Sequence, residues 1–112
     1  MYAGSDFLLM PSRFEPCGLS QMYAQKFGSL PIAHKTGGLA DTIEDGINGF
    51  LFGEPSLHGF VDAIKRGLVA FRSRPRLSAM RRAAMGRPQG WDRSASKYSE
   101  LYDRACHTAA AA

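Results

Sequence analysis

Residues 7–34 of the chain, FLLMPSRFEPCGLSQMYAQKFGSLPIAH, decide the fold. They begin with a continuous apolar run, Phe7–Met10, which is typical of a short strand buried on both faces. Apolar side chains then recur with helical spacing over residues 19–27, and Gly28 stands where a helix commonly ends. Leu30–His34 is a second short apolar segment. The order strand, helix, strand predicts a parallel sheet.

A glycine turn and a third strand follow these two strands. Thr36-Gly37-Gly38 predicts a tight turn, and the next residues predict a short helix over 39–45 that stops at Gly46. Phe50–Phe52 is the third apolar run. Together these segments predict an α/β domain with a layered parallel sheet.

Helical periodicity dominates the second half of the chain. Its apolar residues recur with helical spacing in three segments: residues 57–71, 77–85 and 92–106. Ser56 precedes the first of these segments as a candidate N-cap. We therefore expect covering C-terminal helices, one domain over residues 1–106 and a tail over residues 107–112.

Composition excludes several classes of protein. The 112 residues are 45% hydrophobic and 21% charged, which argues against collagen-like repeats and whole-chain disorder. No apolar run approaches the roughly 18 residues that span a bilayer, and the N-terminus lacks the basic region of a signal peptide. The two cysteines, at positions 17 and 106, lack metal-ligand spacing. We expect free thiols, no metal site, no membrane partner and a cytoplasmic location.

The net charge of +4 is unevenly distributed along the chain. Residues 1–56 carry three Lys and Arg against six Asp and Glu, a balance of −3, while residues 57–112 carry eleven against four, a balance of +7. One interpretation is a nucleic-acid-binding surface. We favour a set of solvated helix faces, because the arginines around Pro75 lack interleaved aromatic residues suited to base stacking.

The loop at residues 12–20, called the site loop below, is the most informative candidate site. It follows the first strand, so it lies at the carboxyl edge of the sheet, where open parallel sheets bind ligands. Gly18 allows the backbone to approach a ligand closely, and the amides of Gly18, Leu19 and Ser20 would be unpaired donors of the helix's first turn. These donors suit a phosphate-bearing ligand, and an ordinary strand-to-helix loop is the alternative.

Three features near the site loop each allow two interpretations. The carboxylate of Glu15 would repel a phosphate, so it would accept hydrogen bonds from hydroxyls of an attached group such as a sugar, or simply lie exposed. His34 ends a buried strand and is interpreted as a structural histidine rather than a ligand. Thr36-Gly37-Gly38 would present backbone amides to a ligand or would only turn the chain.

Two of these motifs resemble those of a known enzyme family. The ten residues 12–21, SRFEPCGLSQ, look very like the active-site loop of bacterial glycogen synthases and plant starch synthases. Residues 36–42, TGGLADT, resemble the family's second signature. The Asn48-Gly49-Phe50 turn and the terminal segment that begins at Trp91 are also similar, so the resemblance covers roughly residues 2–105.

The resemblance implies a retaining glycosyltransferase of the two-lobed GT-B architecture. Such enzymes move glucose from ADP-glucose to the non-reducing end of an α-1,4-glucan, with no metal or other cofactor. The chain would be the second half of the Rossmann-like, nucleotide-sugar-binding C-terminal lobe. Glu15 would be the catalytic residue that holds hydroxyls of the donor glucose, and Thr36, Gly37 and Gly38 are a candidate substrate loop. The residues expected to line the glucose and diphosphate, largely through backbone amides, are Cys17, Gly18, Leu19 and Ser20.

Some positions depart from the family pattern. Tyr23 stands where many relatives in the wider group carry a second glutamate, which favours the glycogen synthase branch over sucrose-synthase-like enzymes. Ser20 stands where threonine is more usual. Arg87-Pro88-Gln89-Gly90 replaces the usual apolar approach to Trp91.

The resemblance also implies that important parts of the enzyme lie outside these 112 residues. The family binds the donor phosphates with an Arg and a Lys earlier in the C-terminal lobe and binds the acceptor with an N-terminal lobe. Because electrostatic stabilisation of the leaving diphosphate is a large part of catalysis, we expect the isolated chain to be inactive. A non-catalytic half-Rossmann module that binds a partner through an exposed sheet edge is an alternative class.

Overall fold

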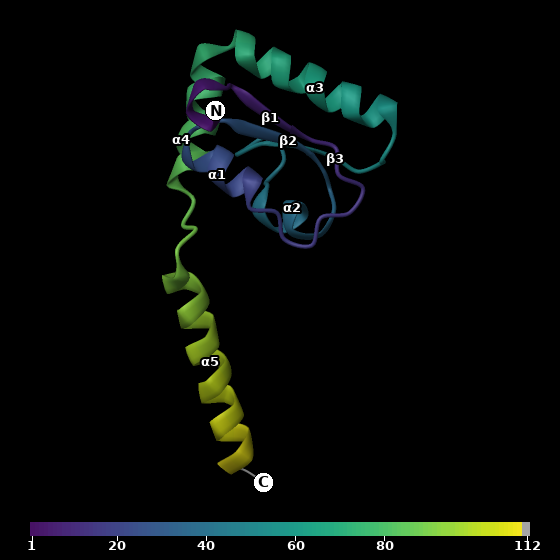
Figure 1. The fold of residues 1–112 in the computed structure, drawn as a ribbon. Coiled ribbons are helices and arrows are strands. Elements are labelled where there is room, and N and C mark those ends of the chain that lie inside the picture. Colours follow the sequence, from purple (N-terminus) through teal and green to yellow (C-terminus); the bar gives the residue numbers. More distant parts are fainter. Residues whose placement is uncertain (111–112) are drawn as a thin grey trace.

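Three parallel strands form the sheet of the computed structural model, which describes residues 1–110 (Figure 1). The strands are β1 (Phe7–Met10), β2 (Leu30–His34) and β3 (Phe50–Phe52), and they lie in that order across the sheet. Both neighbouring pairs are parallel. The three short apolar runs are therefore confirmed as strands, and the α/β class with a parallel sheet is confirmed with them.

Helices cover both faces of this sheet. Within residues 1–110 the helical segments are η1 (Tyr2–Gly4), α1 (Ser20–Lys26), α2 (Gly37–Thr42), α3 (Leu57–Arg72), α4 (Arg74–Gly86) and α5 (Trp91–Ala110). Figure 1 shows α3 on one side of the strands and α1 and α2 on the other. Since β2 lies between the two layers, all five of its residues are buried, as its continuous apolar sequence predicts.

The fully buried residues by which the helix α3 contacts the sheet are small, and the partly buried Phe60 and Ile64 pack beside them. Its buried positions are Ala63, Gly67 and Ala70, and a Cβ atom at Gly67 would lie 3.0 Å from Cδ1 of Ile32. By contrast, the larger apolar stripe that defines the predicted helix is only partly covered, and Leu57 remains 79% exposed. The periodicity located the helix correctly, but the closest approach to the strands requires small side chains.

Two helix boundaries differ from the sequence-based expectation, and a third agrees with it. The segment Thr36-Gly37-Gly38 is not a separate turn, because α2 already begins at Gly37 and ends at Thr42. The helix α4 begins at Arg74, with Pro75 in its first turn, where a missing amide hydrogen costs nothing. The C-cap residue of α1 is followed by Gly28 with a φ of +77°, as predicted.

The helix α5 does not cover the sheet. It leads away from the rest of the structure (Figure 1), and with this helix included the described residues have principal extents of 58 × 29 × 23 Å. Trp91, Tyr98 and Tyr102 are 85%, 58% and 63% exposed. The expectation of covering helices therefore holds for α3 and α4 and is wrong for α5. This helix continues to Ala110, four residues into the predicted tail, and residues 111–112 lie outside the described part.

No helix within residues 1–110 has the length and apolar character needed to cross a membrane.

Candidate functional site

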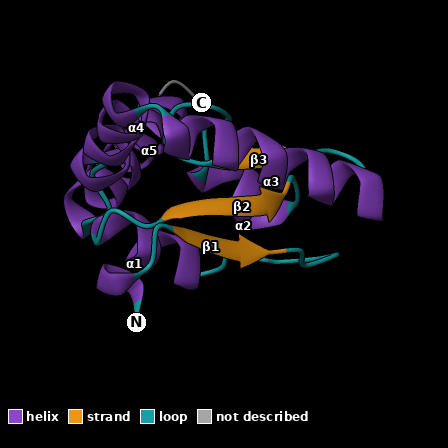
Figure 2. Cartoon of the chain, turned by 90° about the horizontal axis from the view of Figure 1, so that it is seen from above, coloured by secondary structure: helices purple, strands orange, loops and turns teal. Residues whose placement is uncertain are grey.

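The two predicted loops lie at the same edge of the sheet. The strand arrows of β1 and β2 point in the same direction in Figure 2, and the site loop and the Thr36-Gly37-Gly38 segment follow their carboxyl ends. Sheets of this kind bind ligands at that edge. The structure thus brings together the two motifs that the sequence separates by more than a helix and a strand.

The glycines of the second motif contact the backbone of the first directly. The amide of Gly38 donates a hydrogen bond to the carbonyl oxygen of Glu15 at 3.0 Å. A Cβ atom at Gly38 would overlap the carbonyl oxygen of Cys17, and one at Gly37, which has a φ of +41°, would overlap that of Glu15. Glycine is therefore required at both positions. The Gly38 amide is occupied by the site loop, so it is not free for a ligand.

A buried glutamine fastens the same loop from the other side. Gln21, on α1, is fully buried, and its Nε2 donates to the carbonyl oxygens of Cys17 at 3.1 Å and Gly18 at 2.7 Å. The same nitrogen lies 3.0 Å from the Thr42 hydroxyl, so its two hydrogens are shared among three acceptors. The Thr42 hydroxyl itself donates to the Gly38 carbonyl at 2.6 Å. The sequence motif includes Gln21, but its pattern assigns it no role. The available signal was a polar residue on the buried face of a helix.

His34 holds the first end of the site loop. Its Nδ1 lies 2.9 Å from the carbonyl oxygen of Ser12, and its ring lies 5.5 Å from that of Phe52. The side chain is only 8% exposed. These contacts agree with the interpretation of His34 as a structural histidine.

The hydrogen bonds of the loop carbonyls decide where its amides point. The carbonyl oxygens of Cys17 and Gly18 face the protein, and no cis peptide occurs within residues 1–110. In a trans peptide the carbonyl and the amide of one unit point in opposite directions. The amides of Gly18 and Leu19 are therefore turned away from Gln21. Together with the amide of Ser20, they find no acceptor within residues 1–110.

The side chains of the site loop are largely unengaged. Glu15 is half-buried, and within the described residues its carboxylate has no ion-pair partner. Cys17 is a free, exposed thiol, as is Cys106 at the far end of α5. An open groove of about 510 Å³ borders the loop, with Cys17, Leu19, Tyr23 and Trp91 among its lining residues. Leu19 is 57% exposed there.

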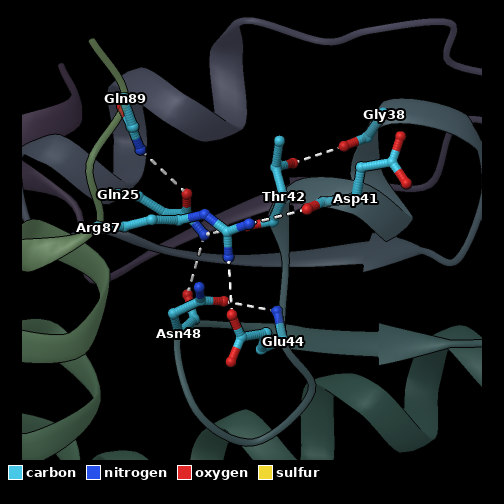
Figure 3. Close-up of polar contacts among 8 residues, drawn as sticks. All are labelled: Gln25, Gly38, Asp41, Thr42, Glu44, Asn48, Arg87 and Gln89. Carbon is cyan, nitrogen blue, oxygen red and sulfur yellow. Dashed lines mark hydrogen bonds and ion pairs between the residues drawn. The ribbon is translucent and has the colours of Figure 1, made fainter. Parts of the chain in front are cut away.

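A second polar network joins the segment before α5 to the end of α2 (Figure 3). The Arg87 guanidinium donates to the carbonyl oxygen of Asp41 at 2.8 Å and to a carboxylate oxygen of Glu44 at 3.0 Å. Gln89 donates to Oε1 of Gln25 at 3.3 Å. The unusual Arg87-Pro88-Gln89-Gly90 sequence is thus held by polar contacts in place of apolar ones.

Within residues 1–110, the arginines of the basic half lie exposed or in ion pairs. Arg81 forms an ion pair with Asp6, and Arg74, Arg76 and Arg82 lie exposed along α4. Arg66, on α3, is bound to Asp45 at 2.9 Å. Solvated helix faces and scattered ion pairs account for the basic half of the chain.

Comparisons with known proteins match the chain to glycosyltransferases. A family model described as "Glycosyl transferases group 1" matches residues 1–82. The chain is 61% identical over 111 residues to a glycogen synthase of Xanthomonas campestris pv. campestris (strain 8004). That match covers 99% of this chain and 23% of the relative, so the chain spans about a quarter of the length of the curated relatives it matches.

Two solved structures share its fold. The catalytic domain of starch synthase IV from Arabidopsis thaliana, bound to ADP and acarbose, superposes with a TM-score of 0.80 and 40% identity, over 92% of this chain and 23% of that one. A sucrose-phosphate synthase from Thermosynechococcus elongatus gives a TM-score of 0.69 and 25% identity, over 96% of this chain and 27% of that one. These likenesses do not favour a nucleic-acid binder or a non-catalytic interaction module.

Proposed function

The chain belongs to the glycosyl transferases group 1 family, and on that premise we propose that it is the donor-binding part of a glycogen synthase. The parent enzyme transfers glucose from ADP-glucose to the non-reducing end of an α-1,4-glucan with retention, in the cytoplasm and with no cofactor. The identity to glycogen synthases along the whole chain supports this assignment. The likeness to a starch synthase structure that holds ADP supports the choice of donor.

The orientation of the site loop is the observation that carries the proposal. Its amides at Gly18, Leu19 and Ser20 have no acceptor within residues 1–110, and Glu15 stands beside them with a free carboxylate. Amide hydrogens suit the oxygens of a diphosphate, and a carboxylate suits the hydroxyls of a sugar. A nucleotide sugar carries both groups side by side, as the loop requires.

The same amides have a role in the chemical step. As the bond between the sugar and the diphosphate breaks, negative charge grows on the departing phosphate oxygens. Fixed donors aimed at that charge stabilise the transition state, and removing one such donor from an enzyme typically costs about 3 kcal/mol. Glu15 holds the glucose in place, and Cys17 lines the space beside it.

The acceptor glucan and the remaining phosphate contacts belong to the rest of the parent enzyme. The chain spans only 23% of its relatives, so we assign to it the donor side of the reaction and not the whole activity. Thr36, Gly37 and Gly38 act through the site loop in this account, because the glycines contact its backbone.

Replacing Glu15 tests this function. In the full-length enzyme that contains this chain, Glu15→Ala should lower glucose transfer from ADP-glucose by about 100-fold, because the donor sugar loses its orientation. The affinity for ADP should change little, since ADP lacks the sugar that Glu15 holds. Transfer is measured with labelled ADP-glucose, and ADP binding by calorimetry.

Glu54→Ala is the matched control, because Glu54 is an exposed glutamate in the loop between β3 and α3. We expect it to leave both measurements unchanged. An equal loss of ADP affinity and transfer in Glu15→Ala would contradict the role assigned to Glu15.

A further inference from the structure

We propose that Gln21 is a positioning residue, which sets the orientation of the site-loop amides through its buried carboxamide. The inference rests on the proposed function, because it concerns the same donor site. Gln21 lies behind the loop, 0% exposed, so it acts through the backbone and touches no substrate.

The contacts of this side chain fix which end of its carboxamide faces the loop. The carbonyl oxygens of Cys17 and Gly18 accept hydrogen bonds and cannot donate them, so the group that faces them must be the NH2 of Gln21. The Thr42 hydroxyl takes the third contact and passes its own hydrogen to the Gly38 carbonyl. One carboxamide therefore links the site loop to the glycine motif of α2.

The other end of the carboxamide shows that this orientation has a cost. Oε1 of Gln21 is buried and has no hydrogen-bond partner within residues 1–110. It occupies the space that a Cβ atom at Gly18 would fill, and Gly18 has a φ of +69°. A buried acceptor without a partner is unusual in proteins. The two hydrogens of Nε2 are shared among the Cys17 and Gly18 carbonyls and the Thr42 hydroxyl, so the carboxamide cannot turn to give Oε1 a partner without losing these contacts.

A second glutamine provides a natural comparison. Gln25 lies one turn later on α1 and is also fully buried. Its Nε2 donates to the carbonyl oxygens of Thr42 at 3.2 Å and Asn48 at 3.4 Å, and its Oε1 accepts from Gln89. It shares residue type, helix and burial with Gln21, but within residues 1–110 it makes no hydrogen bond to the site loop: its partners are the backbone of Thr42, at the end of α2, the backbone of Asn48, and Gln89.

Losing the Gln21 donors should affect catalysis more than folding. Without them, the Cys17 and Gly18 carbonyls are free to rotate, and the amides on the same peptide units rotate with them. The donors then no longer point at the diphosphate, and a misplacement of about 1 Å in such a site typically costs 100-fold in rate. A residue that only stabilised the core would lower the melting temperature without this effect.

Gln21→Met and Gln25→Met in the full-length enzyme separate these roles. Methionine keeps the volume and removes the donors. We expect Gln21→Met to lower kcat/KM for ADP-glucose by about 100-fold. Gln25→Met should lower the melting temperature to a similar degree and leave kcat/KM within about three-fold. An equal effect of both variants on kcat/KM, or unchanged kinetics in Gln21→Met, would overturn the proposal.

Two further measurements keep the test decisive. If Gln21→Met fails to fold, Thr42→Val can be used, because it removes only the hydroxyl link. We expect this variant to lower kcat/KM about ten-fold, a smaller loss because Gln21 keeps its contacts with the loop carbonyls. Unchanged kinetics in Thr42→Val would count against the proposal. The rate of trypsin cleavage after the exposed Arg13 measures how freely the site loop moves, and this measurement does not depend on catalysis. It should accelerate about ten-fold in Gln21→Met and remain unchanged in Gln25→Met.

These outcomes also separate the inference from the function on which it rests. Wild-type enzyme that transfers no glucose from ADP-glucose would contradict the proposed function. The trypsin comparison would then still decide whether Gln21 holds the loop. Equal cleavage rates in the two variants would overturn the role of Gln21 even if transfer were normal.

Discussion

The site loop and the helix α5 differ in what holds them. Most of the site loop has no regular secondary structure, yet carbonyl oxygens at Ser12, Glu15, Cys17 and Gly18 accept hydrogen bonds from residues elsewhere in the fold. By contrast, α5 is a regular helix of 20 residues whose aromatic side chains remain largely exposed. Regular secondary structure and a fixed position are therefore separate properties. The irregular site loop is held by more contacts with the rest of the fold than the regular helix α5.

The largest effect that this comparison predicts comes from Gly38→Ala. The added methyl group would overlap the Cys17 carbonyl, so the two motifs would have to separate. Overpacking of this kind costs about 3 kcal/mol, and we expect transfer by the full-length enzyme to fall below about 1% of wild type. Urea unfolding and the transfer assay measure the two effects.

Gly86→Ala serves as the control for that substitution. Gly86 ends α4, and nothing lies within 4 Å of the position that its Cβ would occupy. We expect stability and transfer to remain close to wild type. Similar losses in both variants would show that the contact between the motifs is not what the substitution at Gly38 disturbs.

The smallest predicted effect lies in α5. Because Tyr98 is 58% exposed, Tyr98→Ala in the 112-residue chain should change the free energy of unfolding by less than about 0.5 kcal/mol. Urea unfolding monitored by circular dichroism measures this. A loss above about 1 kcal/mol in the isolated chain would break the comparison, since it would mean that the helix face is covered after all.

Much of the fold could be predicted because short-range patterns determine it. The three strands coincide with continuous apolar runs, and Ser56 caps α3 by accepting from the amide of Gly59 at 3.1 Å. The location of the site loop also follows from the order of strand and helix. These features depend on residues that are close together in the sequence, so they can be predicted from local sequence patterns.

The remaining features depend on contacts between distant segments. The hydrogen bond from the Gly38 amide to the Glu15 carbonyl joins the first turn of α2 to the site loop, and the contacts of Gln21 include the hydroxyl of the distant Thr42. The helical stripe of α5 predicts a helix, but periodicity does not say what a helix faces, so the expectation that it covers the sheet was wrong. For α3, the pattern of large apolar residues concealed the small residues that contact the strands.

The central claim is that the two motifs form one donor site. Hydrogen–deuterium exchange of the full-length enzyme, with and without ADP-glucose, tests it most directly. We predict that peptides covering residues 12–21 and 36–42 slow their exchange together when ADP-glucose is added. Slower exchange in only one of these peptides, or in neither, would contradict the account.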